Sequence, residues 1–366
     1  MIRTLRPLFR QYPAVSRAQC FSTFPAKFSA APNTPSPAYE VFDKRTKRIQ
    51  KDRAASNASV SREVSYLREE VASRMIERLA FISREFPRVL DLGAGAGTLE
   101  NVLCREDTPD SELVQSRLKH VTMLESSEKL LYRDSDLNQF SFNTKMNLSR
   151  VVGDEEFLTG PDGAPLFPPE SFDAVLSSMS LHWINDLPGI LSRVQDVLVP
   201  DGMFMAAMLG GDSLYELRTT LQLAESERAG GVSPRMSPLA DVRDMGSLMQ
   251  RAKFNLLTVD VDDIIVSYPD TYSLIEDLQA MGESNAVLAR QSYIPRDILV
   301  AADPIYRALH GNEDGSIPAT FRVIYLIGWK PAPTQQKPLA RGSAQMSLKD
   351  ALPTYGSSSS SDSEKK

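Results

Sequence analysis

Short apolar runs alternate with segments of helical spacing along most of the chain. Five runs have the length and composition of buried strands: residues 89–92, 121–124, 148–152, 172–178 and 203–209. Apolar residues recur every three or four positions in five further segments: 64–79, 187–199, 242–252, 272–281 and 296–310. Two last strands are predicted at 256–266 and 321–329. This order predicts an α/β protein with a doubly wound, mostly parallel, seven-stranded Rossmann-like sheet and extra helices before the last strand.

The same pattern divides the chain into four parts. Residues 1–38 form a targeting segment and linker, 39–80 a basic arm followed by a helix, 81–330 the α/β domain, and 331–366 a flexible, Ser-rich tail. Within the domain, residues 105–119 are predicted to be a loop insertion and 200–202 a turn. No apolar run approaches the length that a membrane-spanning helix needs.

The beginning of the chain carries positive charge and no acid before Glu40. Its charged residues are Arg3, Arg6, Arg10, Arg17 and Lys27. An acid-free, Arg-bearing stretch mixed with Leu, Phe and Ser is typical of a mitochondrial transit peptide. The net charge of the whole chain is −6, so the part without these five cations carries −11. Such an acidic domain is a poor candidate for general nucleic-acid binding.

Cleavage of this stretch between residues 17 and 30 removes Cys20 and leaves Cys104 as the one cysteine. The mature chain then forms no intrachain disulfide and no cysteine metal cluster. Residues 41–53 are strongly basic with few apolar anchors. They predict a solvent-exposed helix or arm, or alternatively a contact arm for an acidic partner or a membrane surface.

The first predicted strand ends in a glycine-rich turn with Gly93, Gly95 and Gly97, followed by a helix start. Glycine allows a sharp turn and close approach to a ligand, and the helix start offers free N–H groups. The spacing differs from the G-x-G-x-x-G of dinucleotide sites, and Asp91 precedes the first glycine by two residues. A carboxylate here repels a pyrophosphate but suits an ammonium or sulfonium, and S-adenosylmethionine carries both. A turn in a non-binding domain is the alternative.

The ends of the next strands supply the other predicted cofactor contacts. Glu125 ends the second strand, where a carboxylate accepts hydrogen bonds from both ribose hydroxyls. Asp154, or alternatively Glu155, follows the third strand, where an acceptor meets the exocyclic amine of adenine. Ser126 and Ser178 are further predicted contacts. Plain strand-end and helix-capping acids are the alternative interpretation.

The predicted catalytic residues follow the fourth and fifth strands. His182 and Trp183 lie on the substrate side, or they are ordinary packing residues. Asp212 and Tyr215 open a helix on the same edge. The histidines of the mature chain are His120, His182 and His310, at no recognised ligand spacing, so no metal site is predicted.

With these pieces assembled, the chain resembles the class I S-adenosylmethionine-dependent methyltransferases. The resemblance tightens to the mitochondrial complex I assembly factors of this fold in five segments: 41–51, 177–188, 210–218, 277–285 and 341–344. Relatives tend to have Gly-Cys-Gly-x-Gly where this loop has Gly-Ala-Gly-Ala-Gly. The resemblance carries over Asp91 and the three glycines as the cofactor loop, Glu125 as ribose ligand and Asp154 as adenine ligand.

The resemblance implies a protein of the mitochondrial matrix, peripheral to the inner membrane. It implies S-adenosylmethionine as cofactor and hydroxylation of an arginine in a peripheral-arm iron–sulfur subunit of complex I. The residues themselves leave three functions open. In the first, the chain modifies an arginine of a complex I subunit. In the second, it methylates a small acyl or quinone-type substrate. In the third, it is a non-catalytic assembly chaperone that binds the cofactor as a structural ligand.

Overall fold

The computed structural model describes residues 40–291, 293–336 and 342–343. The predicted transit peptide and nearly all of the predicted tail lie outside the described residues. The chain divides into two compact units after Pro331, and the fold below is that of the first unit. Helices α1 (Lys44–Ser56), α2 (Ala58–Glu63) and α3 (Tyr66–Ala80) belong to this unit together with the sheet.

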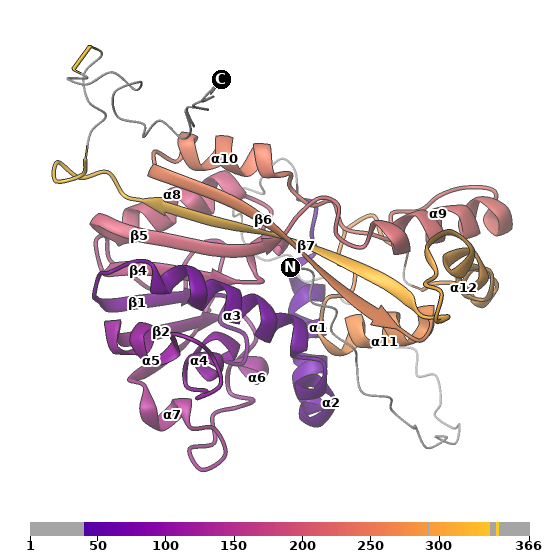
Figure 1. Ribbon diagram of the computed structural model, residues 1–366, viewed down its shortest axis with the longest axis horizontal. Coiled ribbons are helices and arrows are strands. Elements are labelled where there is room, and N and C mark those ends of the chain that lie inside the picture. Colours follow the sequence, from indigo (N-terminus) through magenta and orange to yellow (C-terminus); the bar gives the residue numbers. More distant parts are fainter. Residues whose placement is uncertain (1–39, 292, 337–341, 344–366) are drawn as a thin grey trace, which may run out of the picture. The chain divides into compact units, whose positions relative to one another are not determined.

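The sheet has seven strands in the order β3-β2-β1-β4-β5-β7-β6 (Figure 1). The strands are β1 (Phe86–Leu92), β2 (Leu118–Glu125), β3 (Leu148–Val152), β4 (Phe172–Ser178), β5 (Leu198–Leu209), β6 (Asn255–Tyr268) and β7 (Ile317–Trp329). The first five pair in parallel, and β7 pairs antiparallel with both β5 and β6. The predicted doubly wound, mostly parallel α/β sheet is confirmed.

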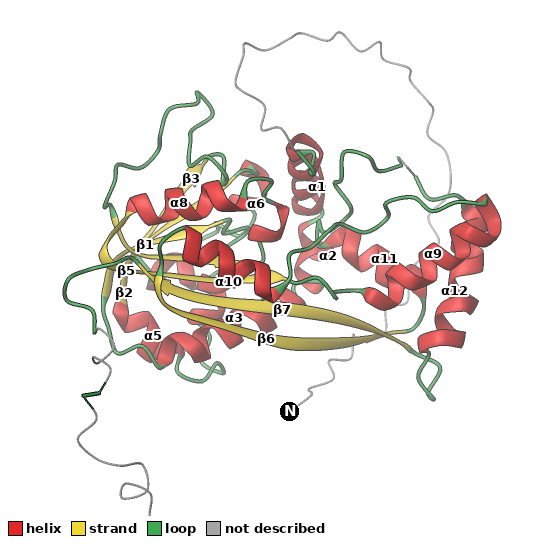
Figure 2. Ribbon diagram, turned by 90° about the horizontal axis from the view of Figure 1, so that it is seen from above, coloured by secondary structure: helices red, strands yellow, loops and turns green. Residues whose placement is uncertain are grey.

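Two apolar layers enclose the sheet, because consecutive strand residues point to opposite faces. In β1, Val89 belongs to the layer beneath α3, α4 (Thr98–Leu103) and α5 (Ser111–Arg117). Its neighbour Leu90 belongs to the layer beneath α8 (Leu187–Val197) and α10 (Val242–Arg251). Figure 2 shows α3 and α5 on one side of the sheet and α8 on the other.

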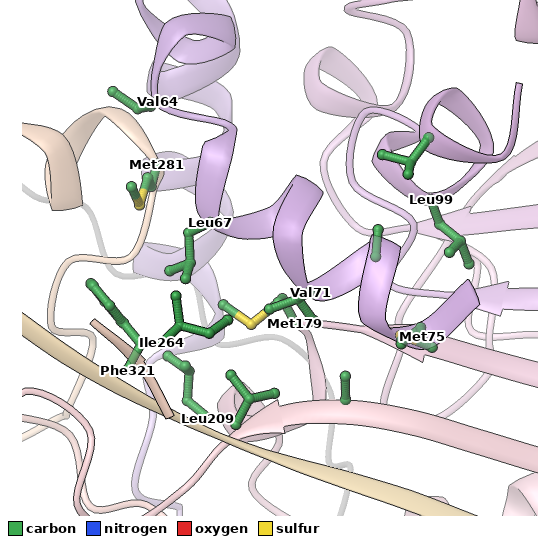
Figure 3. Close-up of a cluster of buried hydrophobic side chains, with 14 of the residues drawn as sticks. Val64, Leu67, Val71, Met75, Leu99, Met179, Leu209, Ile264, Met281 and Phe321 are labelled. Atoms are coloured by element: carbon green, nitrogen blue, oxygen red, sulfur yellow. The ribbon is translucent and has the colours of Figure 1, made fainter. Parts of the chain in front are cut away.

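The first layer packs the helix that follows the predicted basic arm against the sheet. Leu67, Val71 and Met75 of α3 are buried in one cluster with Ile264 of β6 and Phe321 of β7 (Figure 3). Their spacing of four residues puts them on one face of the helix, as the sequence pattern predicts. The N-terminal helices are thereby fixed in place beside the ends of the strands.

The β6–β7 pair is longer than the rest of the sheet. The half of β7 up to Arg322 pairs with β6 alone, since the pairing with β5 starts at Val323. Three helices pack at this extension: α9 (Tyr215–Ala229), α11 (Thr271–Ala280) and α12 (Arg296–His310) (Figure 1). They are the extra helices that the sequence predicts before the last strand.

Two local predictions differ from the structure. The predicted loop insertion at 105–119 contains α5 and the start of β2. The predicted turn at 200–202 lies inside β5, where Asp201 adopts a left-handed φ of 64° and the register with β4 shifts. Both segments are polar in sequence, but Val114 in the first segment and Leu198, two residues before the second, are buried in the core, and this burial fixes regular structure around them.

Candidate functional site

The glycine loop after β1 adopts the backbone that its sequence predicts. Gly93, Gly95 and Gly97 have left-handed φ values of 76°, 59° and 86°. The backbone N–H groups of Gly93 and Ala94 donate to the Leu124 carbonyl at 2.9 and 3.0 Å, which anchors the loop to β2. A Cβ on Gly93 would lie 2.0 Å from Ser180 Oγ. The loop therefore packs directly against the segment that follows β4.

Glu125 ends β2 and faces the loop. Its side chain is 1% exposed, and Gly95 N–H donates to Oε2 at 3.1 Å. Oε1 accepts from Lys51 Nζ at 2.7 Å and from Ser127 N at 3.1 Å. Burial alone would raise the pKa of Glu125, but the Lys51 ammonium and the hydrogen bonds outweigh it and hold the pKa below its usual value. The carboxylate is thus charged and pre-oriented at the loop.

Glu155 lies beside Glu125 and apart from its sequence neighbour Asp154. Its Oε1 is 2.8 Å from Lys51 Nζ and accepts from Ser126 N at 3.1 Å. Burial and the charge of Glu125 raise the pKa of Glu155. Asp154 Oδ1 accepts from the backbone N–H of Glu156 at 2.8 Å and thereby caps its own turn. Of the two residues predicted for adenine, Glu155 therefore joins the Glu125 group.

One face of α1 covers the acidic edge of the sheet with three lysines. Lys44 pairs with Asp154 at 3.1 Å and with Glu156 at 2.8 Å. Lys51 pairs with Glu125 and Glu155. Lys47, which lies between Lys44 and Lys51 along the helix, is buried as well. The prediction of a solvent-exposed arm is therefore wrong for this face, and it holds for the opposite face, where Arg45, Arg48 and Arg53 are exposed. The spacing of three and four residues between the lysines is the sequence signal for a shared face.

Asp91 and Glu100 form a buried carboxyl pair beneath the loop. Each residue is 1% exposed, and Asp91 Oδ1 and both Glu100 oxygens have no hydrogen-bond partner among the described residues. Burial and the neighbouring Glu100 raise the pKa of Asp91, and burial raises that of Glu100. Two carboxyl groups in one apolar site resist ionising together. An unpaired acceptor at this depth suits a cationic ligand group.

We expect Glu100→Gln to raise the melting temperature at pH 8. A carboxyl pKa that is raised in the folded state makes the free energy of unfolding fall as pH rises above the ordinary value of about 4. The neutral amide removes this penalty, so the melting temperature should rise by about 2–4 °C, or about 1 kcal/mol, at pH 8 and little at pH 4. The exposed Glu128→Gln is the control, and equal shifts at both pH values would contradict the account.

A second group of charges surrounds Glu283, which follows α11. Its Oε2 accepts from Trp183 Nε1 at 2.6 Å and lies 3.3 Å from His182 Nε2 and 3.4 Å from Lys47 Nζ. Its Oε1 pairs with Arg68. Burial would raise the pKa of Glu283, but Lys47, Arg68 and His182 hold it well below its usual value. Burial lowers the pKa of His182, so the imidazole is neutral at physiological pH.

The structure therefore brings His182 and Trp183 together with a partner that the sequence analysis missed. Glu283 lies a hundred residues further along the chain, and no local pattern marks it. Ser178 ends β4 immediately before Met179, which has a left-handed φ of 56°. Left-handed backbone in a non-glycine residue costs about 1–3 kcal/mol and persists only where the surrounding structure holds it.

Asp212 and Tyr215 contact other partners. Asp212 pairs with Arg322 of β7 and has an exposed side chain. The Tyr215 ring contacts His310 of α12 at a centroid distance of 5.8 Å. Both therefore contact the β6–β7 extension and its helices, whereas His182 and Trp183 contact Glu283.

A small cavity lies beside the glycine loop. Gly95, Ala96, Arg68, Arg133 and Met281 are among its lining residues. Arg68 lies near both groups, because it pairs with Glu283 and its Nη1 lies 4.0 Å from the Cβ position built on Gly95. The Gly95 loop and the Glu283 group are therefore neighbours, with Arg68 between them.

A family model described as a methyltransferase domain matches residues 64–259. The zebrafish (Danio rerio) protein named "Arginine-hydroxylase NDUFAF5, mitochondrial" is 46% identical over 310 residues, covering 85% of this chain and 89% of that protein. The human protein of the same name is 42% identical over 345 residues, covering 94% and 92%. The chain belongs to this arginine-hydroxylase family. It is an enzyme of the class I methyltransferase fold, and the resemblance seen in the sequence is confirmed.

More distant relatives have a different named activity. The malonyl-[acyl-carrier protein] O-methyltransferase of Laribacter hongkongensis is 30% identical over 301 residues, covering 82% of this chain and 94% of that protein. Among solved structures, the YcgJ protein of Bacillus subtilis covers 72% of this chain with a TM-score of 0.45 and 16% identity. In the part of the chain that the structure describes, no helix is long and apolar enough to cross a membrane.

Proposed function

We propose that this protein binds S-adenosylmethionine and hydroxylates an arginine in a peripheral-arm iron–sulfur subunit of complex I. The inserted oxygen atom comes from dioxygen as a co-substrate, and two electrons from an external reductant convert the second oxygen atom to water, since the methyl group of S-adenosylmethionine supplies no oxygen. The proposed place is the matrix side of the mitochondrial inner membrane. The names of the relatives at 42–46% identity support an arginine target and a mitochondrial location. The basic, acid-free start of the chain agrees with import into the matrix.

The residues at the glycine loop fit S-adenosylmethionine. The observation that carries this is the buried Asp91, whose Oδ1 has no partner in the described part of the chain and faces an environment that favours a cation. Asp91 would take the ammonium group, Glu125 the ribose hydroxyls and Asp154 the adenine amine. When bound, the cofactor supplies a sulfonium-activated methyl group.

Glu125 is not a free acceptor, and this sets a condition on binding. Lys51 Nζ, Gly95 N and Ser127 N already donate to its two oxygens. A ribose diol therefore competes with Lys51, which keeps Glu155 as a second partner at 2.8 Å. The two carboxylates let the ammonium shift from one to the other without losing its ion pair.

The test is mass analysis of the matrix-arm subunits of complex I isolated with and without this protein. We expect one arginine-containing peptide to gain a single oxygen atom only when the protein is present. A gain of a methyl group instead would show protein methylation, and no change in any subunit would overturn the proposal. Matched cells carrying an Asp91→Asn variant serve as the cofactor-site control.

The malonyl-[acyl-carrier protein] O-methyltransferase relatives favour a second function, methyl transfer to an acyl substrate. Methyl transfer asks little of the protein beyond orientation, since the sulfonium is already activated. Complex I subunits would then be unmodified, and labelled methyl groups would appear in a small acyl ester. A non-catalytic assembly chaperone, by contrast, would support complex I assembly even as the Asp91→Asn variant.

A further inference from the structure

The group around Glu283 has the composition of a site for an organic cation. We call it the Glu283 pocket, and it consists of Lys47, Arg68, His182, Trp183 and Glu283. The Lys47 ammonium lies over the Trp183 ring, 3.2 Å from its centroid, and 3.4 Å from Glu283 Oε2. A carboxylate beside an aromatic face is the combination that recognises cations in proteins.

The charges in the Glu283 pocket do not balance. Two cations, Lys47 and Arg68, share the one carboxylate of Glu283, and the neutral His182 adds no charge. Burial lowers the pKa of Lys47 to about 7, because Glu283 compensates only part of the cost of desolvation. Lys47 Nζ also donates to the Gly282 carbonyl at 2.6 Å, so its place offers a cation an aromatic face, a carboxylate and a carbonyl acceptor. A guanidinium is more weakly hydrated than an ammonium and therefore keeps its charge in this buried place at a lower cost.

We propose that the Glu283 pocket binds the guanidinium group of the substrate arginine in the place that Lys47 takes in its absence. This deepens the proposed function and rests on it. A planar guanidinium stacks on an indole and pairs with a carboxylate through two N–H groups, whereas an ammonium does neither as well. Trp183 Nε1 already fixes Glu283 Oε2 at 2.6 Å, so the acceptor is pre-oriented.

The location agrees with a substrate position. Arg68 joins the pocket to Gly95 of the glycine loop, and Ser180, two residues before His182, packs on Gly93. A guanidinium in the pocket would therefore lie next to the proposed cofactor. Trp183 is partly exposed at the outer side, beneath α1 and in edge contact with Phe42. An incoming side chain could enter there as the flexible Lys47 side chain leaves.

The test is binding of two neutral-capped amino acids, N-acetyl-arginine methylamide and its uncharged isostere N-acetyl-citrulline methylamide, to the full chain without cofactor. The indole N–H resonance of Trp183 is the readout, because this N–H donates to Glu283. We expect the Lys47→Ala variant to bind the arginine probe about tenfold more tightly than the unaltered protein, since the competing ammonium is gone and its place over the Trp183 ring is open. The citrulline probe should leave the resonance unchanged.

The double variant Lys47→Ala, Glu283→Gln should lose the arginine response while keeping its fold, because the amide has the shape of the carboxylate. Arg78→Ala removes a cation–π contact with Tyr325 instead and is the matched control. Equal binding of both probes, or an arginine response that survives Glu283→Gln, would overturn the proposal.

Failure of this proposal can be told apart from failure of the proposed function. If the partner arginine is hydroxylated equally well by the Glu283→Gln variant, the function stands and the pocket assignment is wrong. If the probe binds as expected but no subunit gains oxygen, the pocket stands as an arginine site and the hydroxylase proposal fails.

Discussion

Replacing Glu125 with Gln should weaken S-adenosylmethionine binding by about 10- to 100-fold. Hydrogen bonds to a charged acceptor contribute about 1.5–3 kcal/mol each, and the neutral amide retains only one acceptor oxygen for the ribose diol. The remaining amide NH2 group would also point at Gly95 N–H or the Lys51 ammonium, both of which are donors. Equilibrium dialysis with labelled cofactor measures the change.

Glu225→Gln is the matched control for this variant. Glu225 is also 1% exposed and also pairs with a cation, Arg235, at 2.6 Å, but it belongs to α9 on the β6–β7 extension. Any loss of affinity from disturbing a buried ion pair in general would appear in both variants. Equal affinities of the two variants would remove Glu125 from the cofactor site.

Replacing Gly93 with Ala should destabilise the protein by about 2–5 kcal/mol. The left-handed φ of 76° costs a residue with a Cβ about 1–2 kcal/mol, and overpacking adds about 1–3 kcal/mol. The added Cβ would lie 2.0 Å from Ser180 Oγ and 2.3 Å from Ser180 Cβ, so rotation of the Ser180 side chain alone does not relieve the clash. Urea unfolding measures the loss.

Gly163→Ala separates the two causes. Gly163 has a similar φ of 80°, and a Cβ there would meet nothing within 4 Å. Its substitution should cost only the backbone contribution, about 1–2 kcal/mol. Adding Ser180→Gly to Gly93→Ala should recover the packing contribution and leave the strain. A Gly93→Ala variant no less stable than Gly163→Ala would show that the loop does not pack on Ser180.

Sequence periodicity was sufficient for most of the sheet because the central strands β1, β2 and β4 are compact apolar runs that are buried along most of their length. The glycine loop was equally visible, since left-handed backbone at Gly93, Gly95 and Gly97 needs the residue type that the sequence shows. The roles of Asp91, Glu125 and Asp154 toward a cofactor remain predictions. Their positions at one edge follow from the parallel strands that carry them.

The lysine face of α1 and Glu283 could not be found in the same way. A basic helix in isolation is expected to be solvated, and only the acids at the ends of β2 and β3 make burial of Lys51 favourable. Glu283 follows α11, and its contacts with Trp183 and Arg68 depend on how the whole unit packs. Pairings of this kind are tertiary and leave no periodic signal in one sequence.

Calorimetric titration of the folded, unaltered protein with S-adenosylmethionine tests the central claim most directly. We expect saturable binding of S-adenosylmethionine at one site per chain. Absence of binding heat at concentrations that saturate other enzymes of this fold, from protein shown to be folded, would contradict it.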